Sequence, residues 1–473
     1  MDRLSALDVS FLTNESSTAH MHVGGLMIFE GPPPSYDELL EHIHGRLHLV
    51  PRFRQKLAFP PAPTGRPFWV DDSAFNLSYH VRHSALPAPG SEEQLRNMAS
   101  RVFSQRLDRT KPLWELWFVQ GLTRKRFALV TKTHHALVDG VSGVDIATVL
   151  FDVQPVPEPD QPEHEWVPSP SPSGAQLLAK DAEAVASAPV RFLRRVERAI
   201  ENPRSTLHQV SEAAEAVGEV GWNFANPAPE VPLNQAIGSH RRFFWVRSDL
   251  ATFKRIKDTF GGTVNDVVLA VVAGAMRRWL TSRGVRTEGL ELRAQVPVSI
   301  RGADEHGKLG NRLAVVRGPV PVYAEDPVRR LALCREEMEG IKHSKQALGA
   351  EVISRFNDFA PPTLLAQAAR INFSTRLFNL VVTNVPGPQF PLYLIGRELE
   401  DVFPVGFLPP NQVLFIAIMS YNGEINFGLL GDYDAMYDLE FVAAAFEDSV
   451  AELADAADAD AASAPAPEST KTS

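Results

Sequence analysis

The sequence predicts an α/β protein built from two domains of comparable size. The chain has 473 residues, which allows two large domains or about three of ordinary size. Helix-like and strand-like apolar patterns alternate in both halves, and a Pro-rich stretch separates the halves. We therefore expect an N-terminal domain over 1–152, a crossover over 153–224, a C-terminal domain over 225–455 and a disordered tail over 456–473.

The elements of the first half follow from short apolar patterns. Alternating or continuous apolar runs predict strands, and apolar residues at three- and four-residue spacing predict helices. The pattern predicts strands at 22–29 and 127–133 and helices at 35–48, 92–107 and 145–151. A mixed sheet carrying helices is the expected result.

A break in composition marks the crossover. Residues 153–174 contain too many prolines for a helix or a central strand, so we expect an extended linker. Residues 175–220 are rich in Ala, Glu and Arg and predict two or three helices. In the second domain we expect helices at 264–283 and 439–454 and strands at 292–297, 378–383, 413–419 and 425–430.

Composition excludes several classes of function. Hydrophobic residues make up 44% and charged residues 22%, an ordinary globular balance. The net charge of −10 argues against nucleic acid as a partner, because phosphate contacts need clustered Lys and Arg. The single cysteine, Cys334, cannot form an internal disulfide and excludes thiolate clusters. Its surroundings predict a helix and not a nucleophile turn.

The N-terminus and the hydropathy predict a cytoplasmic protein. The first residues lack the basic and apolar regions of a secretory signal. The most apolar run, 267–276, is half the length of a membrane-spanning helix and predicts a buried core helix. Attachment to a membrane surface stays open, because peripheral binding leaves little trace in hydropathy.

The stretch from Thr133 to Gly140 carries the most chemical information. His134 and His135 come at the end of a strand, and neighbouring strand residues point to opposite faces. One imidazole should therefore be available as a base, and the other should be packed. Asp139 and Gly140 follow and allow a turn that orders the loop. Ordinary strand-end histidines are the alternative interpretation.

We expect no metal at the other histidines or at this pair. Adjacent histidines on a strand have poor geometry for zinc, which favours i, i+4 spacing and further ligands. His20 and His22 are interpreted as packing or surface residues. The group of His42, His44 and His48 lies in a predicted helix without an obvious third ligand.

The segment Thr263–Asp266 opens the long apolar helix. Thr263 is a suitable N-cap, and Asp266 stands at the reciprocal position of a capping box. This explains Asp266 structurally. Asn265 has a second interpretation, since a polar group at a helix N-terminus can hold an oxyanion or a phosphate.

Several motifs in this order resemble one bacterial enzyme family. His134–Gly140 (HHALVDG) matches the HHxxxDG pattern of CoA-dependent acyltransferases with the chloramphenicol acetyltransferase fold. Pro112, Leu113 and Trp114 resemble the PLW motif of the wax ester synthase / acyl-CoA:diacylglycerol acyltransferase family, and Asn265–Asp266 its ND motif. The opening LSALDVSFL…MHVGGLMIFEG and the segments 297–301, 384–388 and 420–423 are also similar to this family.

The resemblance implies a two-domain fold with its active site at the domain interface, and a mechanism. His135 would be the general base that activates the hydroxyl of a diacylglycerol or long-chain alcohol. The oxygen would attack the thioester of acyl-CoA, a co-substrate, with no bound cofactor and no covalent enzyme intermediate. Asp139 would be structural and paired with an arginine, for which Arg301 is our candidate. The acceptor would be met at a membrane or lipid-droplet surface.

Two alternatives remain at this stage. A condensation-type transferase of the same fold would take its acyl group from a carrier protein. A non-catalytic lipid-binding or droplet protein would keep the fold without the reaction. Trp114 is interpreted as a packing anchor, or as part of the acyl or CoA channel. The oligomeric state and the preferred acceptor do not follow from the sequence.

Overall fold

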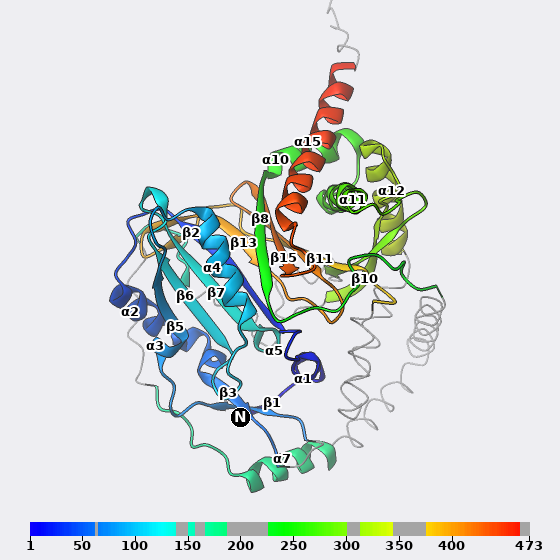
Figure 1. Ribbon diagram of the computed structural model, residues 1–473. Helices are drawn as coiled ribbons and strands as arrows, with labels where there is room; N and C mark the ends of the chain where they lie inside the picture. The colour runs from blue at the N-terminus through cyan, green and yellow to red at the C-terminus, as the bar shows by residue number, and fades with distance from the viewer. Residues whose placement is uncertain are drawn as a thin grey trace, which may run out of the picture.

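The computed structural model of the chain describes residues 1–61, 65–138, 150–156, 166–186, 226–299, 313–343 and 375–463. Two mixed six-stranded sheets dominate the described part of the chain (Figure 1). A smaller three-stranded sheet joins the N-terminus to the first half. It contains β1 (Asp2–Arg3), β4 (Phe68–Asp71) and β3 (Gln55–Ala58).

The first large sheet has the strand order β12-β13-β2-β7-β6-β5. Its two central strands pair antiparallel, with His22 opposite His134. The edge strand β5 pairs parallel with β6. The strands are β2 (His22–Phe29), β5 (Val81–Ala85), β6 (Trp114–Gln120), β7 (Phe127–His134), β12 (Tyr393–Leu394) and β13 (Arg397–Val405).

The second large sheet has the order β10-β9-β11-β14-β15-β8. The parallel β11/β14 and β11/β9 pairs lie at its centre, and antiparallel pairs flank them. The strands are β8 (Arg241–Asp249), β9 (Leu292–Ser299), β10 (Leu313–Val320), β11 (Leu380–Pro386), β14 (Leu414–Tyr421) and β15 (Glu424–Asp432).

Helices cover the second sheet and line the first. The apolar helix α11 is buried from Asp266 to Met276 and lies between α12 and α15 (Figure 1). The helices are α1 (Ala6–Asn14), α2 (Tyr36–Arg46), α3 (Leu77–His80), α4 (Glu92–Ser104), α5 (His135–Val138), α7 (Gly174–Ala186), α10 (Leu250–Phe260), α11 (Val264–Ser282), α12 (Pro327–His343) and α15 (Leu439–Ser463). Short 3-10 turns lie at Leu47–Leu49, Pro51–Arg54 and Thr123–Lys125.

Strand β13 joins the two halves of the fold. It belongs to the C-terminal half of the chain, yet it pairs with β2 of the first sheet. The ring of its Phe403 stacks on Trp245 of β8, with centroids 4.8 Å apart. The residues of 225–455 therefore contribute two strands, β12 and β13, to the first sheet, which a division by sequence position does not anticipate.

Helix α4 makes a second connection between the sheets. Strand β8 is an edge strand, and an edge leaves backbone N–H groups without sheet partners. Ser104 Oγ accepts from the Arg241 amide at 2.8 Å, and Ser100 Oγ accepts from the Phe243 amide at 2.9 Å. Two hydroxyls of α4 thus accept from backbone N–H groups at the β8 edge of the second sheet.

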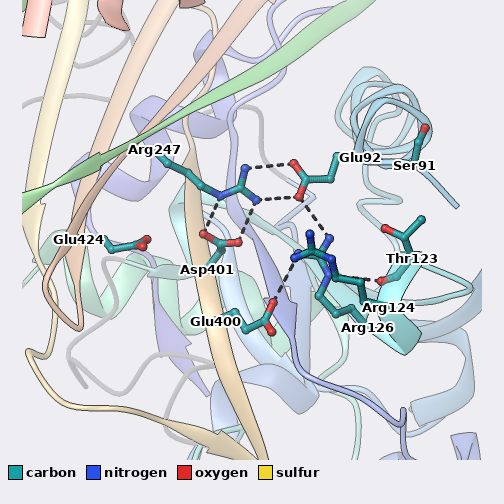
Figure 2. A pocket seen from close by; sticks show the side chains of 9 residues that line it. All are labelled: Ser91, Glu92, Thr123, Arg124, Arg126, Arg247, Glu400, Asp401 and Glu424. Carbon is teal, nitrogen blue, oxygen red and sulfur yellow. Dashed lines mark hydrogen bonds and ion pairs between the residues drawn. The ribbon is translucent and has the colours of Figure 1, made fainter. Parts of the chain in front are cut away.

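A hollow of about 530 Å³ opens beside this connection (Figure 2). Its centre is Arg247 of β8, which donates to Asp401 of β13 at 2.9 Å and to Glu92 of α4 at 3.0 Å. Arg126 lies 3.4 Å from Glu92 and 3.4 Å from Glu400. The hollow contains none of the predicted site residues, and its arginines Arg247 and Arg126 pair with acidic residues from both halves of the chain.

The strands and helices predicted from local patterns within the described residues are present, with some changes at their ends. The predicted helix at 35–48 ends as α2 at Arg46 and continues as a 3-10 turn. The closing helix continues to Ser463 instead of ending at Ala454, so the first part of the predicted tail is helical. Cys334 is buried in α12, as its surroundings predict. Most of the helix predicted at 145–151, and most of the crossover, lie outside the described residues.

Among the described helices, none alone has the length and apolarity needed to cross a membrane. The neighbouring helices α10 and α11 meet this test only as a pair, and they are bent by 100° at their junction.

Candidate active site

The predicted histidine pair lies where β7 ends and α5 begins. The His134 amide donates to the Leu113 carbonyl at 2.9 Å, and the His135 amide donates to the Met21 carbonyl at 2.8 Å. The two carbonyls belong to the residues directly before β6 and β2, the strands on either side of β7. Because the backbone is held from both sides, the change from strand to helix falls between the two histidines.

His134 is completely enclosed. Its side chain is buried, and its Nδ1 accepts from the Ala136 amide at 3.1 Å. Its Nε2 faces Glu15 Oε2 at 3.7 Å, which is longer than a normal hydrogen bond. Burial lowers the pKa of His134, so the ring is neutral at neutral pH. Both ring nitrogens of His134 therefore face other groups of the protein, the Ala136 amide and the Glu15 carboxylate.

His135 is half-buried and has aromatic neighbours. Its ring stacks on Phe11 of α1, with centroids 4.0 Å apart and planes 20° apart. Phe407, which follows β13, meets the ring edge-on at 5.7 Å. The two phenyl rings also contact each other, with centroids 6.3 Å apart, so the three rings form one aromatic group that holds the imidazole in orientation.

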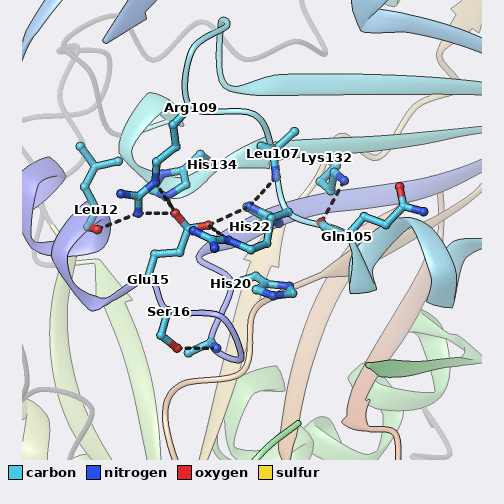
Figure 3. A network of polar contacts seen from close by, with 12 residues as sticks. Leu12, Glu15, Ser16, His20, His22, Gln105, Leu107, Arg109, Lys132 and His134 are labelled. Carbon is cyan, nitrogen blue, oxygen red and sulfur yellow. Dashed lines mark hydrogen bonds and ion pairs between the residues drawn. The ribbon is translucent and has the colours of Figure 1, made fainter. Parts of the chain in front are cut away.

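A buried polar cluster lies behind the pair (Figure 3). Its centre is Glu15, whose side chain is 1% exposed. Arg109 donates from Nε to Glu15 Oε2 at 2.6 Å and from Nη2 to the Leu12 carbonyl at 2.8 Å. Burial alone would raise the pKa of Glu15, but contacts with His134 and His22 and the charge of Arg109 outweigh it. The pKa is held well below its usual value, and the carboxylate is charged.

His22 and His20 complete this cluster. Nε2 of His22 lies 3.4 Å from Glu15 Oε1 and 3.4 Å from the Leu107 amide nitrogen. Burial lowers the pKa of His22 to about 3, so the ring is neutral. The ring of His20 lies 5.6 Å from that of His22, and its Nε2 is 3.1 Å from the Ser17 carbonyl. The two residues are therefore buried members of the cluster, and the packing interpretation fits them better than the surface one.

A charged lysine lies on the same face of β7 as His134. Lys132 is fully buried, and its ammonium contacts Glu115 at 3.1 Å. It also donates to the carbonyls of Val102 and Gln105, at 3.1 and 3.2 Å, where α4 ends. A cation at a helix C-terminus is favourable, because the last carbonyls are unsatisfied there. Lys132 thus attaches α4 to the strand that carries the pair.

The PLW segment supports the site through its backbone. Trp114 is fully buried, and its Nε1–H donates to the Phe53 carbonyl at 2.8 Å. Its ring stacks on His80 at 4.6 Å. Pro112 and Leu113 are buried as well, and the Leu113 carbonyl holds His134. These contacts are those of a packing anchor, which is one of the two interpretations of Trp114.

The ND segment lies at the start of α11. Thr263 and Asp266 form the predicted capping box: the Asp266 amide donates to Thr263 Oγ1 at 3.3 Å, and the Thr263 amide donates to Asp266 Oδ2 at 2.7 Å. Asn265 Oδ1 accepts from Asn384 of β11 at 3.4 Å. The structure thus brings together two segments that the sequence singled out, 265–266 and 384–388. Their side-chain hydrogen bonds within the described residues do not reach the histidine pair.

Three predicted site residues, Asp139, Gly140 and Arg301, lie outside the described residues. Their roles stay predictions. Within the described ranges, no group of three or more His, Cys, Asp or Glu side chains has the arrangement of a metal site.

Sequence reasoning missed Glu15, Arg109 and Lys132. Lys132 had a usable signal, since a lysine inside the strand 127–134 is unusual among buried apolar residues. Glu15 and Arg109 had none, because they are far apart in the sequence and meet only in the fold.

Comparison with solved structures places the fold in a known class. The starter condensation domain of rhizomide synthetase superposes with a TM-score of 0.53 at 13% identity, over 97% of this chain and 94% of that chain. At this identity the likeness shows the fold alone. The class is therefore defined by its fold, which the condensation domain and this chain share over nearly their whole lengths.

Closer relatives define the family. The model described as wax ester synthase/diacylglycerol acyltransferase catalytic domain matches residues 4–268, and the WS/DGAT C-terminal domain matches residues 309–454. A probable diacylglycerol O-acyltransferase of Mycobacterium tuberculosis (tgs1) is 32% identical over 460 residues, covering 96% of each chain. A wax ester synthase/diacylglycerol acyltransferase from Marinobacter aquaeolei superposes with a TM-score of 0.65 at 27% identity, over 96% of this chain and 100% of that chain.

The chain belongs to the wax ester synthase/diacylglycerol acyltransferase family. This confirms the resemblance found in the motifs, the two-domain acyltransferase fold, and the prediction of an O-acyltransferase that uses acyl-CoA and a hydroxyl acceptor.

Proposed function

We propose that this acyltransferase esterifies diacylglycerol with the acyl group of acyl-CoA, that long-chain alcohols are a second acceptor, and that His135 is the general base. One observation supports this choice of base. Within the pair, His134 is fully enclosed with its Nδ1 hydrogen-bonded to the backbone, whereas His135 is half-buried and contacts Phe11 and Phe407.

The reaction is a direct transfer. An imidazole nitrogen of His135 takes the proton of the acceptor hydroxyl while the oxygen attacks the thioester carbonyl. The tetrahedral intermediate then expels the CoA thiolate, which receives the proton from the imidazolium. An ester and free CoA result, and the base returns to its neutral form. The scheme needs no bound cofactor and no covalent enzyme intermediate.

Other residues have proposed roles in this scheme. Asn265 is a candidate donor to the oxyanion of the tetrahedral intermediate. Asp139 and Gly140 shape the loop after the pair, and Arg301 is the candidate partner of Asp139. If that pairing is correct, Arg301→Ala lowers activity as Asp139→Ala does. Full activity in Arg301→Ala beside an inactive Asp139→Ala refutes the pairing.

The decisive experiment measures thiol release from palmitoyl-CoA, with dioleoylglycerol, with hexadecanol, and without acceptor. We expect acceptor-dependent release by the wild type and a loss of about 100-fold or more in His135→Ala, since general base catalysis contributes about 10²–10⁴-fold. His48→Ala, which removes an exposed histidine, is the control and should keep full activity. Unchanged release in His135→Ala contradicts the assignment of the base.

The same assay tests the alternatives. Acyl transfer from an acylated carrier protein, with no use of palmitoyl-CoA, indicates a condensation-type donor. Lipid binding without release of CoA from any acyl-CoA indicates a non-catalytic lipid-binding protein. The family argues against both of these outcomes.

We further propose that the enzyme is cytoplasmic and meets its lipid acceptor at a membrane or droplet surface. Exposed aromatic side chains support this: Tyr433 and Tyr437 in the segment between β15 and α15, and Phe441 in the first turn of α15. Tyrosine rings suit the boundary between lipid and water. We expect the protein to pellet with neutral lipid droplets in high salt, and Tyr437→Ser/Phe441→Ser to weaken this. Complete release by salt contradicts apolar attachment.

A further inference from the structure

One helix contacts both histidines of the pair. Phe11 and Glu15 are four residues apart, so they lie on the same side at the end of α1. Phe11 stacks on His135 at 4.0 Å, and Glu15 faces Nε2 of His134 at 3.7 Å. The two neighbouring histidines therefore contact two side chains that are one helical turn apart at the end of α1.

The charge of Glu15 is costly to place where it lies. A buried carboxylate is tolerated only when it is paired, because burial removes its hydration. The Arg109 guanidinium pairs with it, and Arg106 lies 3.8 Å away. The pairing explains why the carboxylate is ionised. It does not explain why a carboxylate stands beside His134.

The surroundings of His134 determine its tautomer. Since Nδ1 accepts from the Ala136 amide at 3.1 Å, the single proton of the neutral ring resides on Nε2. That proton faces the Glu15 carboxylate. A proton on Nδ1 would instead face the Ala136 N–H, and Nε2 would present a lone pair to a negative charge. The carboxylate thus favours the Nε2–H tautomer of His134. In this tautomer Nδ1 can accept from the Ala136 amide, which lies in the first turn of α5.

We propose that Glu15 is a positioning residue: its carboxylate keeps the Nε2–H tautomer of His134, and this holds the backbone turn that presents His135. The inference rests on the proposed role of His135. Glu15 acts through His134 and the Ala136 amide, so it affects the chemical step and not the binding of acyl-CoA.

The kinetic test compares Glu15→Gln with a matched control. Glu15→Gln keeps the size of the side chain and removes its charge. We expect kcat to fall about 10- to 100-fold with the KM for palmitoyl-CoA within about twofold, as for the loss of an interaction that matters in the transition state. Glu15→Asp, which restores the charge, should recover part of kcat.

The control removes another buried carboxylate that is paired with an arginine. Asp152 accepts from Arg46 at 2.7 Å, and Arg46 also lies 3.2 Å from Nε2 of His42. Asp152→Asn should lower the thermal midpoint but leave kcat within about twofold. A Glu15→Gln enzyme that keeps full kcat, or that changes only KM, overturns the proposal.

A second measurement does not depend on activity. Nitrogen chemical shifts of ¹⁵N-histidine-labelled protein distinguish the two tautomers, and the His134 signals are identified by their loss in His134→Asn. Wild type should show Nε2–H, and Glu15→Gln a mixture. An Nδ1–H tautomer in the wild type overturns the proposal. The predicted tautomer in a protein without transferase activity contradicts the proposed function but not the positioning role.

Discussion

At the residue level, burial separates two neighbouring side chains of identical chemistry. His134 and His135 differ in exposure because the strand ends between them and the backbone is held by Leu113 on one side and Met21 on the other. The alternation of strand side chains predicts that only one imidazole is available. The choice of His135 came from the resemblance to the family, and the enclosure of His134 supports it.

The buried histidines predict how stability depends on pH. The pKa of His22 is lowered to about 3, against about 6.5 in the unfolded chain. The unfolded state therefore binds a proton that the folded state refuses. The contribution of His22 to the free energy of unfolding is fully present above pH 6.5. It is lost as the pH falls toward 3, by about 1.4 kcal/mol per pH unit.

Urea unfolding between about pH 7 and pH 5 measures this slope. The slope of the unfolding free energy against pH reports the protons bound on unfolding. His22→Gln should lower this number by about one, while His48→Gln, at an exposed site, should leave it unchanged. Equal slopes in wild type and His22→Gln contradict the low pKa. His134 contributes in the same direction, because burial lowers its pKa as well.

At the element level, helix ends were more predictable than strand partners. The capping box of α11 depends on residues within one turn, so Thr263 and Asp266 could be identified from the sequence. The pairing of β13 with β2 joins residues far apart in the chain, and no local pattern shows it. The stacking of Phe11 on His135 has the same origin.

Removing the cap should weaken α11 by a measurable amount. Thr263→Ala loses the acceptor for the Asp266 amide, and such substitutions cost about 0.5–2 kcal/mol. Because α11 is the buried helix of the second half, we expect the thermal midpoint of the protein to fall. Thr281→Ala, at an exposed position in the last turn of α11, is the control and should change little. A smaller effect at Thr263 than at Thr281 refutes the role of the cap.

At the level of the whole molecule, the two sheets are connected by few but specific contacts. β13 pairs in one sheet and packs on the other, α4 satisfies the edge of β8, and Arg247 links α4, β8 and β13. Phe407 follows β13 and contacts His135, so the same strand that connects the halves also reaches the site.

Arg247→Ala should therefore loosen the connection between the halves. Its loss leaves Asp401, which is 9% exposed, without its partner. Arg247 itself is 35% exposed, so solvent screening reduces the cost to about 1–2 kcal/mol, between the ranges for exposed and buried pairs. High salt should narrow the difference in thermal midpoint from the wild type. Arg255→Ala removes the exposed pair with Asp458 and should have no measurable effect, so an equal loss in both variants refutes the argument.

The sequence by itself determined what depends on neighbouring residues and on periodicity. This includes the α/β class, the strands and helices with a clear apolar pattern, the capping box, the buried helix at 264–283, the histidine pair and, through its motifs, the family. Such features are visible because their causes lie within a few residues or repeat with a fixed period.

Only the tertiary structure decided which residues surround the pair. Glu15, His22 and Arg109 come from separate segments, and burial brings them together (Figure 3). Phe407, from another segment, contacts His135. The same holds for the crossing of β13 between the halves. The partner of a buried charge and the partner of a strand are both distant in sequence. Desolvation and packing in the folded molecule decide which partners are favourable.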